Sequence, residues 1–244
     1  MNLDQVKTTG VIGAGTMGAA IAQLAAQAGC NAILYDIKED ALENGKASIH
    51  KNLDGALKRN KIDENQKQAI LDRITFTNYF NALKADFLIE AVVEDLAVKQ
   101  QVFNDLHAQN APDAIFATNT SSIPISRVAN GIMNPERVIG MHFFNPAHIM
   151  KLVEVISGVD TNQEVSDLTY NFAKLMGKKP VNAKDAPGFI VNRVARNFYV
   201  EGLKIAEENV AKYGTIDDLI EATGFKMGPF QLMDLIGVDS NFNV

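Results

Sequence analysis

A glycine-rich turn near the N-terminus constrains the fold of this chain more than any other feature. Gly13, Gly15 and Gly18 form the pattern G-x-G-x-x-G between an apolar run at 6–12 and a predicted helix at 16–28. The first glycine permits a tight turn, the second lets a phosphate approach the backbone, and the third lets the helix lie close to its strand. The N–H groups and the dipole at such a helix start attract a pyrophosphate. The pattern alone also fits a plain strand–turn–helix, so the next strand matters.

An acidic residue ends that next strand. Residues 31–35 form a short apolar run, and Asp36 follows 18 positions after Gly18. A carboxylate at this place accepts hydrogen bonds from ribose hydroxyls, and its charge repels a 2′-phosphate. We therefore predict NAD rather than NADP, with a helix N-cap as the alternative role of Asp36. The cofactor residues predicted in this region are Gly13, Gly15, Thr16, Met17, Gly18 and Asp36.

Short apolar strands then alternate with helices along most of the chain. Further strands are predicted at 74–77, 86–93, 114–118, 137–141 and 151–156, and helices at 38–60, 63–72 and 94–109. This alternation predicts an α/β fold of the Rossmann type, with a doubly wound, mostly parallel sheet covered by helices on both faces.

Helix starts and apolar stripes refine this prediction. Asp63 is a candidate N-cap, and Thr161-x-x-Glu164 is a capping box that opens a further helix. The residues expected to face inward are Met17, Ile21, Leu24 and Ala28 in the first helix, Val98, Val102 and Leu106 in the helix at 94–109, and Val165, Leu168, Phe172 and Leu175 after the capping box.

The pattern changes at Pro187, which we expect in the first turn of a long helix. Everything after it is predicted to be helical, with turns at Gly214, Gly224 and Gly228. We therefore predict a Rossmann-like NAD-binding domain at 1–186, followed at 187–244 by the start of a smaller all-helical domain.

Composition excludes several classes of function. The net charge of -6 does not favour nucleic acid or an anionic membrane as partner. Cys30 is the single cysteine, so an internal disulfide is impossible, and no metal-ligand pattern stands out. No apolar run is long enough to cross a membrane, and the first residues carry no basic leader. We expect a cytoplasmic protein that holds no metal.

One of the four histidines stands where a ligand is expected to bind. His142 directly follows the strand predicted at 137–141, and ligands bind at the carboxyl ends of strands in open α/β sheets. The other three lie in predicted helices or a loop: His50, His107 and His148. An isolated histidine at a strand end is often structural, so a partner would be informative.

Glu154 is the candidate partner. It lies in an alternating strand, on the same face as Leu152 and Ile156. Either the strand is an exposed edge with Glu154 in water, or the chain folds back and pairs Glu154 with His142, since an unpaired buried carboxylate is costly. A carboxylate on one imidazole nitrogen fixes the tautomer. Such a histidine could take a hydroxyl proton while hydride leaves the same carbon for NAD⁺.

Two polar segments could complete the site. Residues 119–122, Asn-Thr-Ser-Ser, follow the strand ending at Thr118, and their hydroxyl and amide groups could bind a substrate oxygen. An ordinary turn with a helix cap is the competing interpretation. Asn192, near the start of the helical domain, either reaches the substrate or is a surface residue.

At this point the chain resembles the L-3-hydroxyacyl-CoA dehydrogenases, from about residue 6 to about residue 239. The motifs that carry the resemblance are the glycine turn, Asn119-Thr-Ser-Ser, His142-Phe-Phe-Asn-Pro, Lys151-Leu-Val-Glu-Val and Pro187-Gly-Phe-Ile-Val-Asn-Arg, in that order. The segment beginning at Gly228 looks most like bacterial phenylacetate-pathway members, such as 3-hydroxyadipyl-CoA dehydrogenases, while the wider family works mainly in fatty-acid β-oxidation and butyrate routes.

The resemblance implies reversible oxidation of (S)-3-hydroxyacyl-CoA by NAD⁺, in a homodimer formed through the helical domain. It implies that His142 is the acid/base, paired with Glu154. By the same resemblance, the residues that position the 3-oxygen and the thioester are Ser121, Asn145 and Asn192. The residues implied to lie on the cofactor side are Glu94, Lys99 and Asn119. The residues implied to lie near the CoA phosphates are Lys58 and Arg59, within a basic cluster that also holds Lys51 and Lys61. Basic residues at a helix end also suit its dipole, which is the alternative role of that cluster.

Two departures from the family pattern stand out. Ala20 occupies a position where the family commonly has glycine, and the chain stops where members continue into further helices, so we expect a truncated helical domain. That would leave apolar residues such as Ile220, Leu232 and Leu235 short of partners. Two other functions stay open: an inert NAD-binding structural protein of the same family, and a dehydrogenase of free 3-hydroxy acids.

Overall fold

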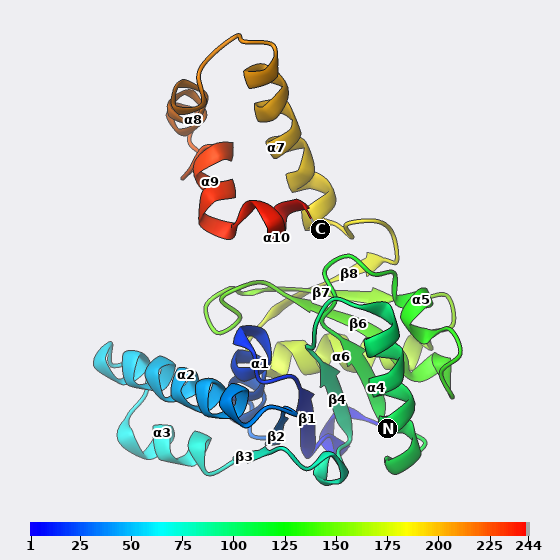
Figure 1. Ribbon diagram of the computed structural model, residues 1–244. Coiled ribbons are helices and arrows are strands. Elements are labelled where there is room, and N and C mark those ends of the chain that lie inside the picture. The colour runs from blue at the N-terminus through cyan, green and yellow to red at the C-terminus, as the bar shows by residue number, and fades with distance from the viewer. Residues whose placement is uncertain (243–244) are drawn as a thin grey trace. The chain divides into compact units, whose positions relative to one another are not determined.

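A computed structural model describes residues 1–242 of the chain (Figure 1). Residues 243–244, where the predicted truncation falls, lie outside the described residues. The chain divides into two compact units, Met1–Asp185 and Ala186–Val244.

The first unit is built on one sheet of eight strands (Figure 1). The strands are β1 Thr8–Ile12, β2 Asn31–Tyr35, β3 Ile74–Thr77, β4 Phe87–Glu90, β5 Ile115–Thr118, β6 Val138–Phe143, β7 Leu152–Ser157 and β8 Lys179–Lys184. Their order is β3-β2-β1-β4-β5-β6-β7-β8, and only the β6–β7 pair is antiparallel. The predicted doubly wound, mostly parallel sheet is therefore confirmed, and the strand order reverses at β1, where such sheets bind ligands.

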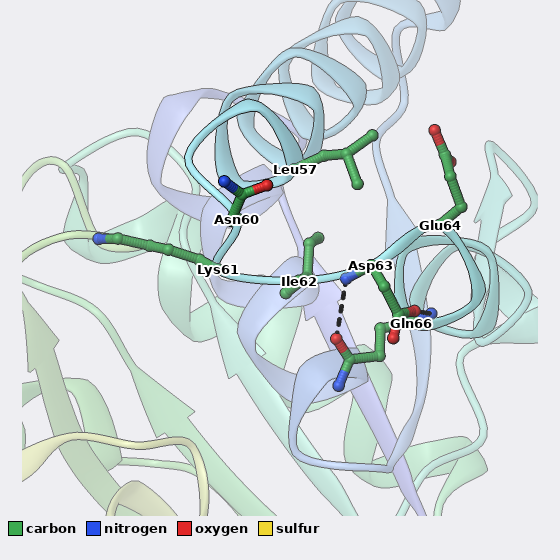
Figure 2. A pocket seen from close by; sticks show the side chains of 7 residues that line it. All are labelled: Leu57, Asn60, Lys61, Ile62, Asp63, Glu64 and Gln66. Carbon is green, nitrogen blue, oxygen red and sulfur yellow. Dashed lines mark hydrogen bonds between the residues drawn. The ribbon is translucent and has the colours of Figure 1, made fainter.

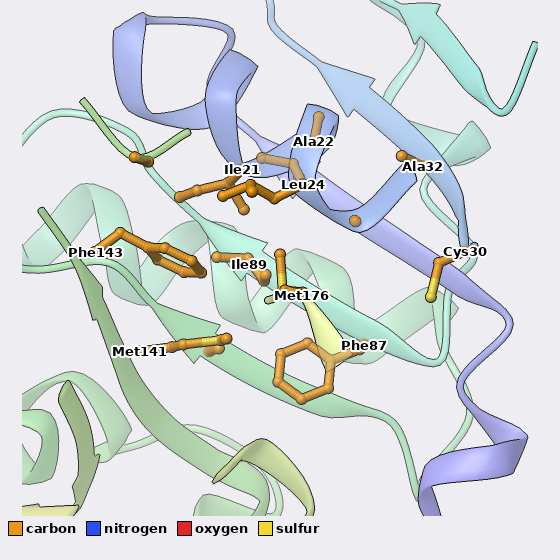
Figure 3. Close-up of a cluster of buried hydrophobic side chains, with 14 of the residues drawn as sticks. Ile21, Ala22, Leu24, Cys30, Ala32, Phe87, Ile89, Met141, Phe143 and Met176 are labelled. Atoms are coloured by element: carbon orange, nitrogen blue, oxygen red, sulfur yellow. The ribbon is translucent and has the colours of Figure 1, made fainter. Parts of the chain in front are cut away.

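Helices cover both faces of this sheet. They are α1 Thr16–Gln27, α2 Glu39–Lys58, α3 Glu64–Leu71, α4 Leu96–Gln109, α5 Ile125–Ala129 and α6 Gln163–Leu175, with short 3₁₀ turns at Leu3–Gln5, Phe80–Ala82 and Pro135–Arg137. Figure 3 shows part of the main core, in which Ile21 and Leu24 of α1 pack over Ile89, Met141 and Phe143 of the sheet. The same core includes buried side chains of α2 and α6.

The opposite face of the sheet packs against α4 and α5. Phe103 of α4 meets Phe116 of β5 with ring centroids 6.0 Å apart, and the Ile125 side chain of α5 lies against Gly140 of β6. Because side chains alternate along a strand, His142 shares this face with Gly140, whereas Met141 and Phe143 face the main core. The functional candidates on the strands therefore lie on the α4–α5 side.

Several predicted elements need correction in detail. The strand predicted at 86–93 ends at Glu90, and residues 91–95 form bends before α4. The buried residues of α4 are Lys99, Phe103 and Leu106, so Leu106 is buried as predicted, whereas Val98 is exposed and the first two predicted positions were wrong by one residue. In α1, every residue from Gly18 to Ala26 is buried, because the helix packs against both the sheet and α2.

The capping box predicted at Thr161 is wrong. Helix α6 has Asn162 as its N-cap without a side-chain cap bond, and the Thr161 hydroxyl instead donates to the carbonyl of Val138 at 2.6 Å. Leu175, predicted to face inward, is exposed. Strand β8 was missed altogether; it holds Pro180 and lies at the sheet edge, where a residue without an N–H is tolerated.

The second unit consists of α7 Val191–Glu207, α8 Tyr213–Ala222, α9 Pro229–Ile236 and α10 Val238–Phe242. The predicted helix start at Pro187 is wrong, since residues 187–190 form a turn before α7. Gly214, predicted as a turn, lies inside α8. The buried Asp217 carboxylate accepts the N–H groups of Phe230 and Gln231 at 2.9 and 3.1 Å, which fixes α9 against α8. Through residue 242, the chain has no helix long and apolar enough to cross a membrane.

Candidate active site

His142 and Glu154 face each other across the antiparallel β6–β7 pair. They are register partners, and Nδ1 of His142 lies 2.7 Å from Oε2 of Glu154. Both residues are buried, with exposed fractions of 4% and 0%. His142 lies inside β6, one residue before its end, rather than after the strand as predicted, because β6 extends to Phe143. The strand pairing itself therefore sets the distance between the two groups.

The burial of Glu154 follows from the position of β7. This strand is hydrogen-bonded to β6 on one side and to β8 on the other, so the alternative of an exposed edge strand is wrong. A buried carboxylate needs a charged or hydrogen-bonding partner. An ionised Glu154 only accepts hydrogen bonds, so Nδ1 of His142 must carry the proton and donate it. In the neutral imidazole tautomer that this contact selects, Nε2 is the ring nitrogen that carries the lone pair.

The loop after β5 lies beside the end of β6. The Asn119 side-chain oxygen accepts the N–H of Phe143 at 2.9 Å, and the Asn119 N–H donates to the carbonyl of Glu90 at 2.8 Å. The N–H of Ser121 donates to Oε1 of Glu94 at 2.9 Å. Asn119, Ser121 and Glu94 are thus brought together at the same end of the sheet as His142.

A buried carboxylate that sequence analysis missed lies at the end of β4. Glu90 is fully buried, and its two oxygens lie 2.8 and 3.0 Å from Nζ of Lys99. Lys99 also contacts Oε2 of Glu94 at 3.1 Å. The available signal was an acidic residue ending an otherwise apolar strand, followed nine positions later by a lysine on a helix.

The Glu94 carboxyl sits in a strongly polar environment. Burial by itself raises the pKa of Glu94, but the Lys99 ammonium and hydrogen bonds from Thr120 and Ser121 outweigh that effect. The net result is a pKa below the ordinary value, so Glu94 is ionised at neutral pH. It can therefore accept several donors from the 119–122 loop at once.

The glycine turn forms a cradle at the end of β1. Gly13 has a φ of 102°, and a Cβ on Gly18 would lie 1.7 Å from the Gly13 carbonyl oxygen, so neither position accepts another residue without strain. A Cβ on Gly15 would meet no atom within 4 Å, and Thr16 begins α1 in an exposed position. In the described structure no side chain caps this helix start, which leaves its N–H groups for an anion.

Asp36 lies beside that turn. Its Oδ2 accepts the N–H of Ala14 at 2.8 Å, and its Oδ1 accepts the N–H of Lys38 at 3.0 Å. Lys38, not Asp36, is the N-cap of α2, so the alternative role of Asp36 as the helix cap is wrong. A pocket of about 270 Å³ opens here between α1 and α2, and its lining residues include Ala14, Gly15, Thr16, Asn44 and Ser48. A phosphate-accepting turn with an adjacent carboxylate and open space fits a dinucleotide.

The other predicted residues lie on the β6–β7 loop, at the end of α2 and in the second unit. Asn145 is exposed in the β6–β7 loop, directly before Pro146 in a cis peptide bond. Lys58 and Arg59 are exposed at the C-terminal end of α2. Asn192 lies in the second unit, on the first turn of α7.

A second pocket, of about 450 Å³, lies at the connection between α2 and α3 (Figure 2). Its lining residues are Leu57, Asn60, Lys61, Ile62, Asp63, Glu64 and Gln66. Asp63 and Gln66 form a capping box: the Asp63 N–H donates to the Gln66 side chain at 2.9 Å, and the Gln66 N–H donates to the Asp63 carboxylate at 2.7 Å. The predicted N-cap at Asp63 is confirmed, and the mixed charges of this lining give no single ligand class.

No cluster of three potential metal ligands occurs among the described residues.

Both units of the chain match domains of one known protein family. Residues 8–186 match the family model described as "3-hydroxyacyl-CoA dehydrogenase, NAD binding domain", and residues 188–244 match "3-hydroxyacyl-CoA dehydrogenase, C-terminal domain".

Three relatives illustrate the similarity. The chain is 46% identical over 241 residues to 3-hydroxyadipyl-CoA dehydrogenase of Escherichia coli, covering 98% of this chain and 51% of that protein. It is 40% identical to human mitochondrial hydroxyacyl-coenzyme A dehydrogenase, covering 96% of this chain and 77% of the relative. The crystal structure of 3-hydroxybutyryl-CoA dehydrogenase from E. coli superposes with a TM-score of 0.95 at 45% identity, covering 98% of this chain and 51% of that one. The chain thus spans about half the length of these E. coli relatives.

Proposed function

Because the chain belongs to the 3-hydroxyacyl-CoA dehydrogenase family, we propose that it oxidises (S)-3-hydroxyacyl-CoA to 3-oxoacyl-CoA with NAD⁺, using His142 as acid/base. The observation that carries the proposal is the buried contact of 2.7 Å between His142 and Glu154. An imidazole held by a carboxylate, on the same sheet as a phosphate-accepting turn, is suited to proton transfer coupled to hydride transfer.

The chemistry asked of His142 follows from its tautomer. Nε2 accepts the proton of the substrate 3-hydroxyl, and the imidazolium that forms is stabilised by the Glu154 carboxylate at Nδ1. When bound, NAD⁺ supplies the acceptor for the hydride that leaves the same carbon. A positioned general base of this kind contributes about 10²- to 10⁴-fold to the rate.

The substrate-binding roles rest on residue types and on the family. Ser121 and Asn145 are proposed to hydrogen-bond the 3-oxygen and the thioester, together with Asn192 from the second unit. Exposed basic residues at the end of α2, Lys58 and Arg59, are proposed to bind the CoA phosphates. Their position at a helix C-terminus also suits the helix dipole, which is the alternative role of these two residues.

The cofactor is proposed to lie over the ends of β1 and β4. The turn residues Gly13, Gly15, Thr16, Met17 and Gly18 would hold the pyrophosphate, and Asp36 the ribose. Glu94, Lys99 and Asn119 are proposed to act on the cofactor side, with Lys99 acting from a buried position. The carboxylate of Asp36 supports NAD over NADP.

The helical residues 187–244 are proposed to contribute to substrate binding and to a homodimer. Large apolar side chains such as Val194 and Leu235 are exposed on this unit, each with 68% of its surface accessible. Exposed apolar groups of this kind are typical of association surfaces.

Replacing His142 by Gln tests the acid/base role. We expect turnover of NADH with acetoacetyl-CoA to fall by about 10²-fold or more, with little change in NADH affinity, because the ring does not belong to the phosphate cradle. His148→Gln is the matched control, since His148 lies in the β6–β7 loop and outside the pair. A His142→Gln protein that retains full activity would refute the mechanism.

A substrate series separates this function from the two others left open. We expect 3-oxoacyl-CoA thioesters, including acetoacetyl-CoA and 3-oxoadipyl-CoA, to be reduced much faster than the corresponding free acids. A preference for free 3-oxo acids would favour a dehydrogenase of free 3-hydroxy acids. Tight NADH binding without turnover of any thioester would favour an inert binding protein.

A further inference from the structure

We propose that Glu90 is a positioning residue that sets the shape of the 119–122 loop through Lys99 and Glu94. The inference deepens the proposed function, on which it rests, because that loop carries Ser121. Glu90 lies at the end of β4 and is fully buried. Every step of the connection consists of hydrogen bonds or ion pairs within the first unit.

The Glu90 carboxylate is the centre of the arrangement. Besides Lys99, it accepts the hydroxyl of Thr118 and the N–H of Val92, each at 2.7 Å. Glu90 and Thr118 are register partners on neighbouring strands, so the carboxylate links the ends of β4 and β5. Four donor contacts to one buried carboxylate leave it little freedom to reorient.

Lys99 transmits that fixed position to Glu94. Its side chain is 1% exposed, and its ammonium group contacts a carboxylate oxygen of Glu94 as well as both oxygens of Glu90. An ammonium group this deeply buried is stable only beside carboxylates. If Glu90 loses its charge, Lys99 must turn toward Glu94 or toward water, and Glu94 must shift with it.

Glu94 in turn accepts hydrogen bonds from the 119–122 loop. Its Oε2 faces Lys99, while its Oε1 accepts the N–H groups of Ser121 and Ser122 at 2.9 and 3.2 Å. The same oxygen also accepts the hydroxyls of Ser122 and Thr120. The two oxygens of one side chain therefore divide between the buried cation and the loop backbone.

The loop is joined to the catalytic strand by Asn119. This residue bridges the carbonyl of Glu90 and the N–H of Phe143, the residue after His142. A change at Glu90 thus reaches Ser121 through Glu94 and the end of β6 through Asn119. The alternative is that Glu90 and Lys99 merely stabilise the fold, and the experiment must separate the two.

The experiment compares Glu90→Gln, Glu94→Gln and the double variants Glu90→Gln/Lys99→Met and Glu90→Gln/Glu94→Gln with the unchanged chain. Asp95→Ala is the matched control, because the Asp95 side chain caps α4 through the N–H of Val98, while its main-chain carbonyl, which accepts the N–H of Lys99, is kept in alanine. The readouts are thermal unfolding, hydrogen exchange of the 120–122 backbone amides, NADH affinity, and kcat with KM for acetoacetyl-CoA.

Glu90→Gln is expected to speed amide exchange at residues 120–122 and to lower kcat by about 10- to 100-fold, since small displacements of positioning groups have large effects on rate. Glu90→Gln/Lys99→Met removes both buried charges, so its melting temperature should return toward that of the unchanged chain. Its loop exchange and kcat should stay impaired, because Glu94 has lost its cation. Asp95→Ala should lower the melting temperature without raising loop exchange.

The double variant Glu90→Gln/Glu94→Gln tests whether Glu90 acts on the loop through Glu94. If Glu90 acts through Glu94, Glu90→Gln should have little additional effect on loop exchange and kcat in the Glu94→Gln background. Additive effects, or recovery of kcat and loop protection together with stability in Glu90→Gln/Lys99→Met, would overturn the proposal. Absence of turnover in the unchanged chain would instead contradict the proposed function, while loop exchange and NADH affinity would still decide the role of Glu90.

Discussion

At the scale of single residues, Lys178 is a buried cation outside the pair and the cofactor cradle. Its ammonium group donates to the carbonyls of Ala147 and, at 3.0 Å, Met150, both in the loop that carries Asn145. Burial and the nearby charge of Lys151 lower the pKa of Lys178 to about 8. Lys178 therefore fixes the β6–β7 loop while holding its proton less firmly than a free lysine.

This shifted pKa predicts how stability depends on pH. The unfolded chain keeps the Lys178 proton up to the ordinary value of 10.5, whereas the folded chain releases it near pH 8. Between these values the unfolded state binds more protons, so the free energy of unfolding contributed by Lys178 rises with pH. We expect the stability of the unchanged chain relative to Lys178→Met to increase from pH 8 to 10, as measured by urea denaturation. Lys179 is the exposed neighbour, and the stability difference between the unchanged chain and Lys179→Met should not change with pH. A pH-independent difference for Lys178→Met would contradict the lowered pKa of Lys178.

At the scale of elements, two glycines in the turn between β1 and α1 are expected to have different roles, one in stability and the other in cofactor binding. Gly18→Ala places a methyl group 1.7 Å from the Gly13 carbonyl oxygen and is expected to destabilise the chain by about 3 kcal/mol. Gly15→Ala meets no protein atom within 4 Å, so its stability should change by less than about 0.5 kcal/mol. Its methyl group would nevertheless occupy the space of the phosphate, so NADH affinity should fall by about 10-fold or more, measured by fluorescence titration. Unchanged NADH binding in Gly15→Ala would argue against the cradle.

Most elements of the sheet could be predicted from the sequence because their strands are short, apolar and followed by clear turns. The failures have physical causes. Strand β8 escaped notice because an edge strand can be polar and can hold Pro180. The Thr161 hydroxyl bonds to a strand carbonyl that only the tertiary fold brings near. The contact of Glu154 with His142 was one of two alternatives, and the pairing of β7 on both sides decided between them. Glu90 was missed because its local signal, an acidic strand end followed nine positions later by a lysine, does not show that Lys99 turns inward, which only the tertiary fold determines.

At the scale of the whole molecule, exposed apolar side chains are concentrated in the second unit. Half of the large hydrophobic side chains that the described residues expose lie after residue 185, in about a quarter of the chain. We therefore expect self-association at micromolar concentration, and Val194→Glu on α7 should weaken it. Analytical ultracentrifugation measures this effect, with Val159→Glu in the first unit as the control. A chain that stays monomeric, or equal effects of both substitutions, would contradict an association surface on the helical unit.

The contact between His142 and Glu154 also depends on the register in which β6 and β7 pair. If β7 slipped by one residue along β6, His142 would face Val153 or Val155, and the carboxylate would turn to the other side of the sheet. A slipped sheet could retain most of its backbone pairing and its circular dichroism, but it would lack the carboxylate at the imidazole. Under the proposed function, turnover recovered in a refolding experiment would therefore report the fraction of molecules in which β6 and β7 pair in the correct register, which bulk spectroscopy does not resolve.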